Sequence, residues 1–462
     1  MKFDHALVLG GGLAGMLTAA ALARHCAAVT VVERDRLPDG PLPRKGTPQA
    51  HHAHLLMAGG AQAVDELVPG TLAALYEAGA RRIGLPEDLV ALTAHGWQTR
   101  FPASHFLVSC GRPLLDWVVR RQVLRDERIV VRTGTETVRL LGDASRVTGA
   151  DVRGENGGET VSADLVVDTT GRASRARNWL LGLGIPPVRS DSVDSGLVYA
   201  TRIFQAPEGT PHTFPLITIM SAPDSAEPGR NGVLLPVENG QWIVTVSGTR
   251  GGEPPVDEAG FLTFAHSLRH SLIGELIEDA EPLTGIYSSR STVNRRVHYD
   301  RVSRWPEGLL VLGDALAAFN PVYGHGMSCA AIGARALERV LAADPEGGTV
   351  ARKAQQAVAE GVRDAWALAT RQDIRYPGAR VQLADRSPDV SSGISDALER
   401  LALVDPVVSA ASYAINTLSE SPAGVISSRI LDARRGPVPE PPAEPPIKPG
   451  ELPSAGCADS RA

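Results

Sequence analysis

The beginning of the chain alternates between short apolar runs and glycine-rich turns. Uninterrupted apolar runs at about 5–9 and 28–32 predict two buried strands. The Ala-rich stretch between them, about 13–25, has the length and composition of a helix. The order strand, turn, helix, strand predicts a parallel α/β unit at the N-terminus.

Three glycines separate the first strand from the helix with the spacing G-x-G-x-x-G: Gly10, Gly12 and Gly15. Gly10 permits a tight turn, Gly12 lets the backbone approach a pyrophosphate, and Gly15 lets helix and strand pack closely. The helix N-terminus favours the anion. Glu33 ends the second strand and would accept the ribose hydroxyls of an adenosine. This order of features predicts a dinucleotide site.

The following segment indicates which dinucleotide is bound. Residues 41–56, "PLPRKGTPQAHHAHLL", are rich in Pro, Gly, basic residues and His, where a simple NAD fold would continue with a helix and a strand. Arg44 and Lys45 are placed to reach back to the phosphates. Neither an acid nor a Cys accompanies His51, His52 and His54, so we interpret them as a loop beside a cofactor rather than a metal site.

The middle of the chain alternates between helical and strand patterns. Residues 110–124 have helical spacing and begin with Arg112, a cofactor contact or else a surface arginine. The segment "IVVRTGTETVRLLGD" predicts two paired strands, and "VSADLVVDTTGRASRARNWL" predicts a strand ending at Asp168, a turn at Gly171 and an Arg-rich helix. From about 190 to 285, alternating segments predict an antiparallel sheet that would cover an active site.

A second glycine-rich helix start lies in "LGDALAAFNPVYGHGMS", at 312–328. Asp314 ends a buried strand and can accept a ribityl hydroxyl, while Pro321, Gly324 and Gly326 place bare N–H groups before a helix at about 327–342. Such a terminus stabilises the negative charge of a reduced flavin near N1 and the C2 carbonyl. A helix cap alone would explain neither the Gly313-Asp314 pair nor the buried strand that precedes this pair.

The cofactor predicted from these segments is FAD, and no metal is expected. The predicted FAD contacts are Gly10, Gly11, Gly12, Leu13, Ala14, Gly15, Glu33, Arg34, Arg44, Lys45, Arg112, Val138, Asp168, Asp314, Pro321, Gly324, Gly326 and Met327.

Composition narrows the class of protein. With 462 residues, 43% of them hydrophobic and 21% charged, the chain is long enough for two or three subdomains. A net charge of −6 argues against nucleic acid as a partner. The four cysteines are far apart, which favours a reducing compartment. The apolar run at 6–23 contains three consecutive glycines, so it is not interpreted as a signal peptide or a membrane span, and we expect a cytoplasmic protein.

These residues resemble the FAD-dependent monooxygenases of the para-hydroxybenzoate hydroxylase fold, over about 1–345. The segments "RKGTPQAHHAH", "VDTTGRASR", "SGTRGGEPP", "STVNRRVHYDR" and "GDALAAFNPVYGHGM" look closely like the epoxidases of polyether ionophore biosynthesis, above all that of the lasalocid pathway. The resemblance implies FAD, molecular oxygen and a flavin C4a-hydroperoxide. It also implies a hydrophobic linear polyketide polyene as substrate, whose alkenes are epoxidised one after another.

The electron source stays open, because no second G-x-G-x-x-G unit offers an NADPH domain: NAD(P)H acts directly or through a separate flavin reductase. Epoxidation transfers electrophilic oxygen and needs no base that ionises the substrate, so we expect a mainly apolar pocket. The turn from Pro321 to Met327, predicted to contact the flavin, is called the flavin turn. His325, beside Gly324 and Gly326 of this turn, is the candidate catalytic group for protonating or orienting a peroxide. The alternatives are an aromatic hydroxylase, an isoprenoid alkene reductase and a noncatalytic nucleotide-binding carrier.

The predicted fold is α/β: an FAD-binding Rossmann-like domain with an inserted antiparallel-sheet substrate domain and a C-terminal helical region. The expected divisions are 1–80, 107–190 and 286–345 for FAD, 81–106 and 191–285 for the substrate sheet, and 346–436 for the helical region. The Pro-rich tail, 437–462, is expected to be extended or disordered.

Overall fold

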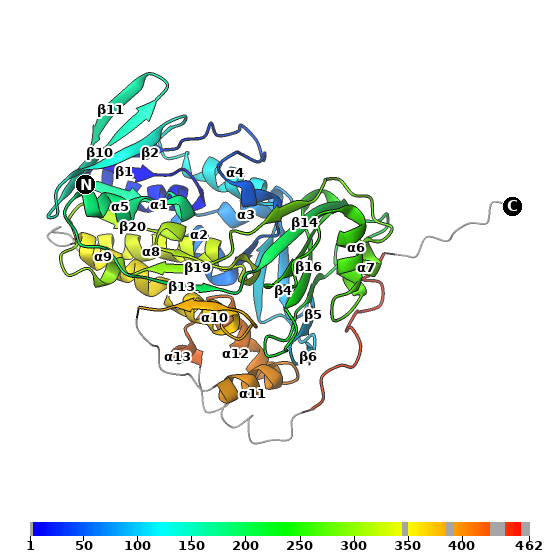
Figure 1. Ribbon diagram of the computed structural model, residues 1–462. Helices are drawn as coiled ribbons and strands as arrows, with labels where there is room; N and C mark the ends of the chain where they lie inside the picture. Colours follow the sequence, from blue (N-terminus) through cyan, green and yellow to red (C-terminus); the bar gives the residue numbers. More distant parts are fainter. Residues whose placement is uncertain (1–2, 344–349, 385–391, 426–438, 454–462) are drawn as a thin grey trace.

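The computed structural model describes residues 3–343, 350–384, 392–425 and 439–453. A five-stranded parallel sheet with the order β20-β12-β1-β2-β8 forms the first large layer (Figure 1). These strands are β1 (Phe3–Leu9), β2 (Cys26–Val32), β8 (Ile129–Arg132), β12 (Leu165–Asp168) and β20 (Leu309–Val311).

The carboxyl ends of three adjacent strands, β1, β12 and β20, are in register. Leu9 pairs with Asp168, and Asp168 pairs with Val311. Because all five strands are parallel, the segments that follow them emerge at one edge of the sheet, which is where such sheets bind ligands. The glycine loop, the turn after Asp168 and Asp314 therefore gather at this edge.

Helices cover this sheet and lead into the rest of the chain. The glycine loop opens α1 (Leu13–Ala23), which packs against α4 (Arg112–Val123) and α8 (Gly326–Ala343). Both predicted helices at 110–124 and 327–342 are thus confirmed. The other α-helices within residues 3–190 are α2 (Ala58–Leu67), α3 (Thr71–Glu77) and α5 (Ala176–Gly182).

The prediction of two paired strands within 129–143 was wrong. Ile129–Arg132 forms β8 and pairs in parallel with β2, whereas β9 (Glu136–Gly142) pairs with β10 (Val147–Gly154) in a separate antiparallel sheet completed by β11 (Gly157–Ser162). Both strands have a suitable apolar pattern, but the free edge of β2 is a long-range partner that local alternation does not reveal.

A seven-stranded sheet forms the second large layer, with the order β18-β14-β17-β16-β15-β5-β6. All of its pairings are antiparallel except that between β15 and β5. Its strands are β5 (Leu89–Thr93), β6 (Gly96–Trp97), β14 (Val198–Gln205), β15 (Leu216–Ile219), β16 (Arg230–Pro236), β17 (Gln241–Gly248) and β18 (Tyr287–Ser289). The helices α6 (Glu258–His266) and α7 (Leu272–Ile277) pack on β17 and β16.

Two small sheets connect these layers. One has the order β3-β7-β4, formed by β3 (Leu55–Met57), β7 (His105–Ser109) and β4 (Arg81–Leu85). The other has the order β21-β19-β13-β22, formed by β21 (Ala317–Ala318), β19 (Asn294–Val297), β13 (Ser190–Asp194) and β22 (Arg380–Gln382). Segment 81–106 therefore contributes to two sheets, and the predicted domain divisions remain a prediction.

The C-terminal region is helical in its described parts. Residues 351–374, which have helical spacing, form two helices that are interrupted at Val362, α9 (Val350–Gly361) and α10 (Arg363–Asp373). They are followed by α11 (Ser392–Ala402), α12 (Pro406–Asn416) and α13 (Pro422–Val425). In Figure 1, α10 to α13 lie beneath the parallel sheet and the seven-stranded sheet.

The described part of the Pro-rich tail, 439–453, has neither helix nor strand, yet it lies against the body of the protein. Glu451 pairs with Arg100, and the two side chains are only 9% and 3% exposed. Ile447 and Leu452 pack against the apolar core beside the seven-stranded sheet. The tail is thus extended, as expected, but docked along its described length; Cys457 lies outside the described residues.

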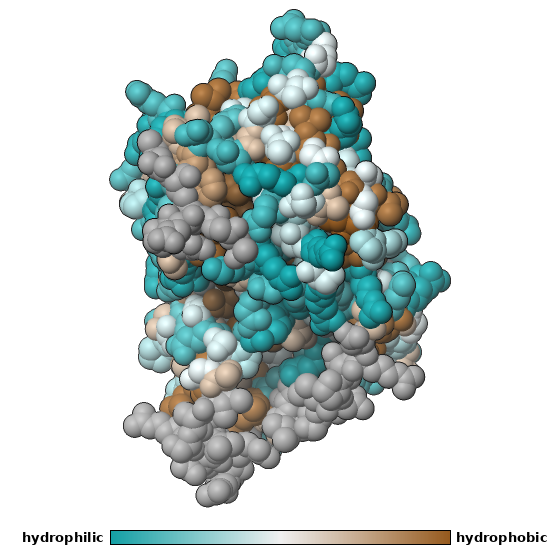
Figure 2. Space-filling view, turned by 90° about the vertical axis from the view of Figure 1, so that its left-hand side faces the viewer, coloured by the Kyte–Doolittle hydropathy of each residue, from teal (hydrophilic) through white to brown (hydrophobic). Residues whose placement is uncertain are grey.

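The described surface is mainly hydrophilic on the face shown in Figure 2, where apolar side chains form small, separate patches. Within the described ranges, no helix is both long and apolar enough to cross a membrane.

Candidate functional site

Of the three spaced glycines in the loop, the fold itself requires Gly10 and Gly15, whereas the space beside Gly12 is open. Gly10 has φ +99°, and a Cβ on Gly15 would lie 1.8 Å from the carbonyl oxygen of Gly10. A Cβ on Gly12 would meet only Arg44, whose Nη2 is 3.5 Å away. Gly10 and Gly15 are therefore needed for the turn itself, whereas the bare backbone at Gly12 is accessible to a ligand.

The buried carboxylate of Glu33 lies directly against this loop. Its Oε2 accepts a hydrogen bond from the backbone N–H of Gly11 at 2.7 Å and is 3.0 Å from Nη1 of Arg44. Arg44 also lies 3.2 Å from Asp35. Two residues predicted from separate motifs, Glu33 and Arg44, are thus joined at the glycine loop.

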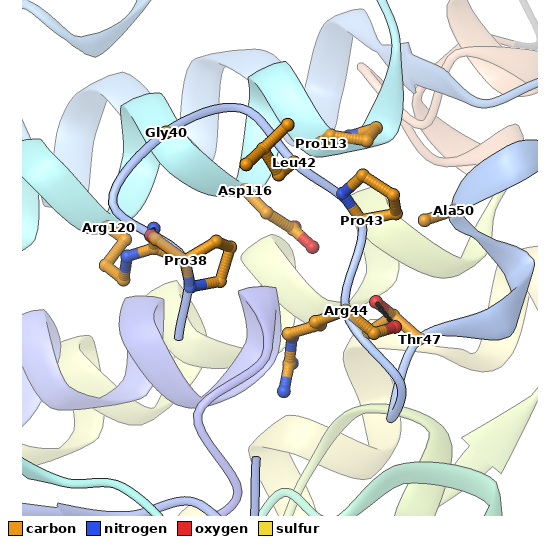
Figure 3. A pocket seen from close by; sticks show the side chains of 10 residues that line it. All are labelled: Pro38, Gly40, Leu42, Pro43, Arg44, Thr47, Ala50, Pro113, Asp116 and Arg120. Atoms are coloured by element: carbon orange, nitrogen blue, oxygen red, sulfur yellow. Dashed lines mark hydrogen bonds between the residues drawn. The ribbon is translucent and has the colours of Figure 1, made fainter. Parts of the chain in front are cut away.

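Segment 38–50 packs against α4 and encloses a small pocket with it. Figure 3 shows Arg44 and Asp116 on opposite sides of this pocket, with Arg120 at one end. Arg120 donates a hydrogen bond to the carbonyl oxygen of Pro38, which ties the segment to the helix. The pocket is lined by Pro38, Gly40, Leu42, Pro43, Arg44, Thr47, Ala50, Pro113, Asp116 and Arg120.

Arg112, at the start of α4, is buried and directed inward. Its Nε donates to Asp116 at 2.8 Å. Burial and the positive charge of Arg112 lower the pKa of His54 to about 3. Burial raises the pKa of Asp314, and the positive charges of nearby arginines, Arg112 among them, oppose this rise. Arg112 is therefore close enough to influence the pKa of His54, in segment 41–56, and that of Asp314.

Asp168 is fully buried and shapes the turn that follows it. Its carboxylate accepts hydrogen bonds from the backbone and hydroxyl of Thr170, at 2.9 and 2.6 Å, and from the hydroxyl of Ser174 at 2.5 Å. Burial raises the pKa of Asp168, and these hydrogen bonds oppose the rise. The described contacts of Asp168 are thus with its own turn, and a direct contact with FAD remains a prediction.

Asp314 combines accessibility with a surrounding that is poor in water. Its side chain is 38% exposed, yet burial among protein atoms raises its pKa. The Nε of Arg172 lies 3.6 Å from its carboxylate. The Asp314 carboxylate is thus accessible enough to accept a hydrogen bond from a cofactor hydroxyl.

Sequence reasoning did not assign a role to Arg172. Its guanidinium donates to the carbonyl oxygens of Val293, just before β19, and of Phe319, just after β21, so it joins these two segments to the carboxylate of Asp314. The local signal was the Arg in "TTGRASR", but the many arginines of this chain made a lone Arg uninformative.

The turn before α8 is tight and adjoins Asp314. Gly324 has φ +69°, a left-handed conformation that favours glycine. A Cβ on Gly326 would lie 3.8 Å from Oδ1 of Asp314. Gly313 approaches Ala14 of α1, so the two predicted ligand segments meet across the sheet edge. The first N–H groups of α8 have no partner within the helix and are available to an anionic group.

His325 is buried, its Nε2 faces α12, and its ring is stacked on that of Tyr323 in the turn, with centroids 6.4 Å apart. Its Nε2 lies 3.1 Å from the carbonyl oxygen of Asn416. Burial lowers its pKa to about 4, so the ring is neutral at neutral pH. The proton on Nε2 is then donated to Asn416, and a catalytic role for His325 stays a prediction that this geometry does not favour.

The three histidines of segment 41–56 have separate partners. The ring of His51 stacks on Tyr287 with centroids 4.0 Å apart, and Nδ1 of His52 lies 2.7 Å from the hydroxyl of Thr201. Nδ1 of His54 lies 2.8 Å from the backbone oxygen of His52. They therefore dock the segment onto the seven-stranded sheet rather than converge on one point.

Three predicted contacts lie at the surface: Arg34 and Lys45 are exposed, and Val138 is 39% exposed on β9. The described residues contain one group with metal-ligand spacing, His95, Asp396 and Glu399. Its carboxylates already pair with arginines, Glu399 with Arg371 at 2.8 Å and Asp396 with Arg375 at 3.2 Å. This cluster therefore resembles an ion-pair network between α10 and α11.

The residues at the sheet edge fit FAD. Gly12 leaves backbone bare for a pyrophosphate, Glu33 provides a carboxylate at the end of β2, and Asp314 with the start of α8 provides a carboxylate and free N–H groups for the flavin end. The fit rests on the accessible Asp314 side chain and the open space at Gly12.

Comparison with known proteins supports this assignment. A family model for FAD dependent oxidoreductases matches residues 6–177. Protein Rv3254 of Mycobacterium tuberculosis is 31% identical over 423 residues, covering 88% of this chain and 87% of its own. The 6-methylpretetramide 4-monooxygenase of Streptomyces rimosus is 26% identical over 352 residues, covering 72% and 74%.

Solved structures share the fold. The flavin-dependent brominase Bmp2 superposes with a TM-score of 0.66 at 14% identity, over 94% of this chain and 100% of its own. The p-nitrophenol 4-monooxygenase PnpA from Pseudomonas putida gives 0.61 at 17% identity, over 94% and 99%. The predicted fold class, a Rossmann-like sheet with added antiparallel sheets and C-terminal helices, is thus confirmed. Together with the relative that is 31% identical along most of the chain, these findings show that the chain belongs to the FAD-dependent oxidoreductase family.

Proposed function

We propose that this chain is an FAD-dependent monooxygenase that epoxidises the alkenes of a linear polyketide polyene, as in the biosynthesis of polyether antibiotics. The proposal rests on the predicted flavin contacts at the sheet edge and on the similarity of the segments around them to polyether epoxidases. Its stoichiometry balances: one atom of O2 enters the alkene, and the other leaves as water with two electrons and two protons from a reductant.

The observation that carries the substrate class is an apolar wall beside the flavin turn. The three atoms nearest to a Cβ placed on Gly324 all belong to Met57 and Leu55, the closest at 3.0 Å. Both side chains are partly buried and pack against a core cluster that includes Leu235 and Ile243 of the seven-stranded sheet. Apolar side chains hold an alkene chain without polar recognition and keep water out.

The chain's own residues would act by binding and orienting. FAD, when bound and reduced, supplies the electrons and activates oxygen. Gly12, Glu33 and Asp314 would hold the cofactor, and the start of α8 would stabilise negative charge at the flavin end. Leu55 and Met57 would bring an alkene close to the reacting oxygen. NAD(P)H, directly or through a separate reductase, would supply the electrons.

Aromatic hydroxylation is the second candidate, because the relative from Streptomyces rimosus is a 6-methylpretetramide 4-monooxygenase. A phenol hydroxylase requires a group that ionises or orients the substrate hydroxyl. A candidate for this group is the hydrogen-bonded chain of His52, Thr201 and Thr245, in which Nδ1 of His52 lies 2.7 Å from the Thr201 hydroxyl and the two hydroxyls lie 2.7 Å apart.

One experiment separates the two candidates. The purified chain is loaded with FAD, supplied with NADPH and a general flavin reductase under ¹⁸O2, and given linear polyenes with trisubstituted alkenes or polycyclic phenols. We expect one ¹⁸O atom in an epoxide for each alkene oxidised. Hydroxylated phenol with unchanged polyene would favour the second candidate, and FAD-loaded protein that oxygenates neither class would contradict both.

A further inference from the structure

A buried carboxylate outside the FAD-binding segments collects hydrogen bonds from the flavin turn. Asp373 is the last residue of α10, in the C-terminal region, and its side chain is 1% exposed. Its Oδ2 accepts from Nδ2 of Asn320 at 2.9 Å, and its Oδ1 accepts from the hydroxyl of Tyr323 at 2.7 Å. Asn320 and Tyr323 bracket the turn that leads into α8.

The same carboxylate also binds strands on the other side of the turn. Nδ2 of Asn294 on β19 donates to Oδ2 at 2.6 Å, and the hydroxyl of Ser195, after β13, is a further hydrogen-bond partner. Asn294 in turn accepts from the backbone N–H of Asn320 at 2.7 Å. One carboxylate thus ties three other segments of the chain to α10.

The chemistry of this cluster suits an ionised acceptor. Burial raises the pKa of Asp373, and the donors presented by the neighbouring amides and the phenol of Tyr323 oppose this rise and offset part of the cost of burial. Removal of the carboxylate would leave several buried donors without an acceptor. Within the turn, the amide oxygen of Asn320 also accepts from the backbone N–H of Val322, beside two backbone hydrogen bonds, from Tyr323 to Asn320 and from Gly324 to Pro321.

We propose that Asp373 is a positioning residue for the flavin turn: from the C-terminal region, it fixes Asn320 and Tyr323 so that the first N–H groups of α8 face the reduced flavin at a constant place. The inference rests on the proposed FAD site. It gives the C-terminal region a direct part in tuning the cofactor, in addition to any role in covering the substrate. Asp373 itself acts through the turn.

The consequence can be measured on the flavin without any substrate. If the turn loosens, the positive end of α8 moves away from the flavin and stabilises the reduced, anionic state less well. The midpoint potential of bound FAD should therefore fall. The affinity for FAD, which depends mainly on the glycine loop and Glu33, should change by less than about threefold.

Tyr323→Phe is the decisive variant, because it removes one hydrogen bond and keeps both the ring and the carboxylate charge. Asp373→Asn tests the carboxylate directly. Asp364→Asn, at a partly exposed residue of the same helix, is the matched control. We expect a lower midpoint potential and an altered visible flavin spectrum in Tyr323→Phe, an altered spectrum in Asp373→Asn, and no change in the control.

An unchanged or higher potential in Tyr323→Phe would overturn the inference, even if Asp373→Asn failed to fold. A chain that does not bind FAD at all would instead contradict the proposed function, so the two failures are distinguishable. When Tyr323→Phe and Asp373→Asn are combined, the spectral change should be no larger than that of Asp373→Asn alone, since both substitutions break the same hydrogen bond. An additive change would overturn the link between the two residues.

Discussion

The Nε2 of His325 lies 3.1 Å from the carbonyl oxygen of Asn416, so this histidine joins the start of α8 to the end of α12. We predict that His325→Gln, which keeps a donor of similar reach, retains FAD binding and most oxygen transfer while lowering the free energy of unfolding by about 1 kcal/mol. Urea denaturation and product analysis test this. Loss of oxygen transfer with normal FAD binding and reduction would make His325 catalytic.

Buried neutral histidines predict how stability depends on pH. The folded-state pKa of His325 is about 4, below its unfolded value of 6.5, because burial disfavours the charged ring. Between pH 6.5 and 4 the unfolded chain therefore binds more protons, so stability is full above pH 6.5 and falls as the pH drops through this window. The contribution is about 1.4 kcal/mol per pH unit.

Urea denaturation at pH 7, 6 and 5 provides the measurement. The loss of stability on acidification should be smaller in His325→Gln than in the unmodified chain. It should not vanish, because burial also lowers the pKa of His52 to about 4. Parallel pH curves for the two proteins would contradict the assignment of His325 as buried and neutral.

The glycine loop allows fold and binding to be separated. Gly15→Ala places a Cβ 1.8 Å from the carbonyl oxygen of Gly10 and should destabilise the protein by about 3 kcal/mol or more. Gly12→Ala meets no such clash and has ordinary extended backbone angles, so the melting temperature of the FAD-free protein should not change. Its FAD affinity should fall at least about tenfold, because the methyl group occupies the pyrophosphate approach.

Flavin fluorescence titration and thermal melting of the same samples measure both effects. Gly182→Ala, at a glycine with open space around it, is the control for a substitution without a clash. If Gly12→Ala bound FAD as tightly as the unmodified chain, the pyrophosphate would have to lie elsewhere.

The docked tail predicts a change in protease sensitivity. Glu451→Gln removes the charge that pairs with the buried Arg100 and should release residues 439–453. The loss of stability should be at most about 3 kcal/mol, since a detached tail lets water reach Arg100. Limited proteolysis should then cut this segment faster than in the unmodified chain or in Glu444→Gln, which changes an exposed tail residue. Equal cleavage rates in all three would show that the ion pair does not hold the tail.

Local sequence signals were sufficient for the first half of the site. Gly10, Gly12, Gly15 and Glu33 lie within one strand–helix–strand unit, where spacing along the chain determines spacing in the fold. The position of Asp314 was predictable because a buried strand ends at Val311, shortly before it. For the same reason, the helices at 110–124 and 327–342 follow from their periodicity.

Contacts between distant segments were not predictable in this way. The partner of β8 is β2 rather than β9, because a strand's own alternation does not encode which edge is free. Arg172 could not be distinguished from the other arginines until its distance to Asp314 was known. The role of Asp373 depends on Asn320 and Tyr323, which lie about fifty residues earlier in the chain.

The strand order of the parallel sheet has a consequence for synthesis of the protein. The glycine loop is synthesised long before β20, which completes the sheet only at residues 309–311, and Asp373 follows later still. At 5–20 residues per second, roughly 20 to 75 seconds separate the synthesis of the glycine loop from that of Asp373. FAD therefore cannot meet a finished site until Asp373 has been made, and until β20 is made the apolar strands of the unfinished sheet are exposed on the nascent chain.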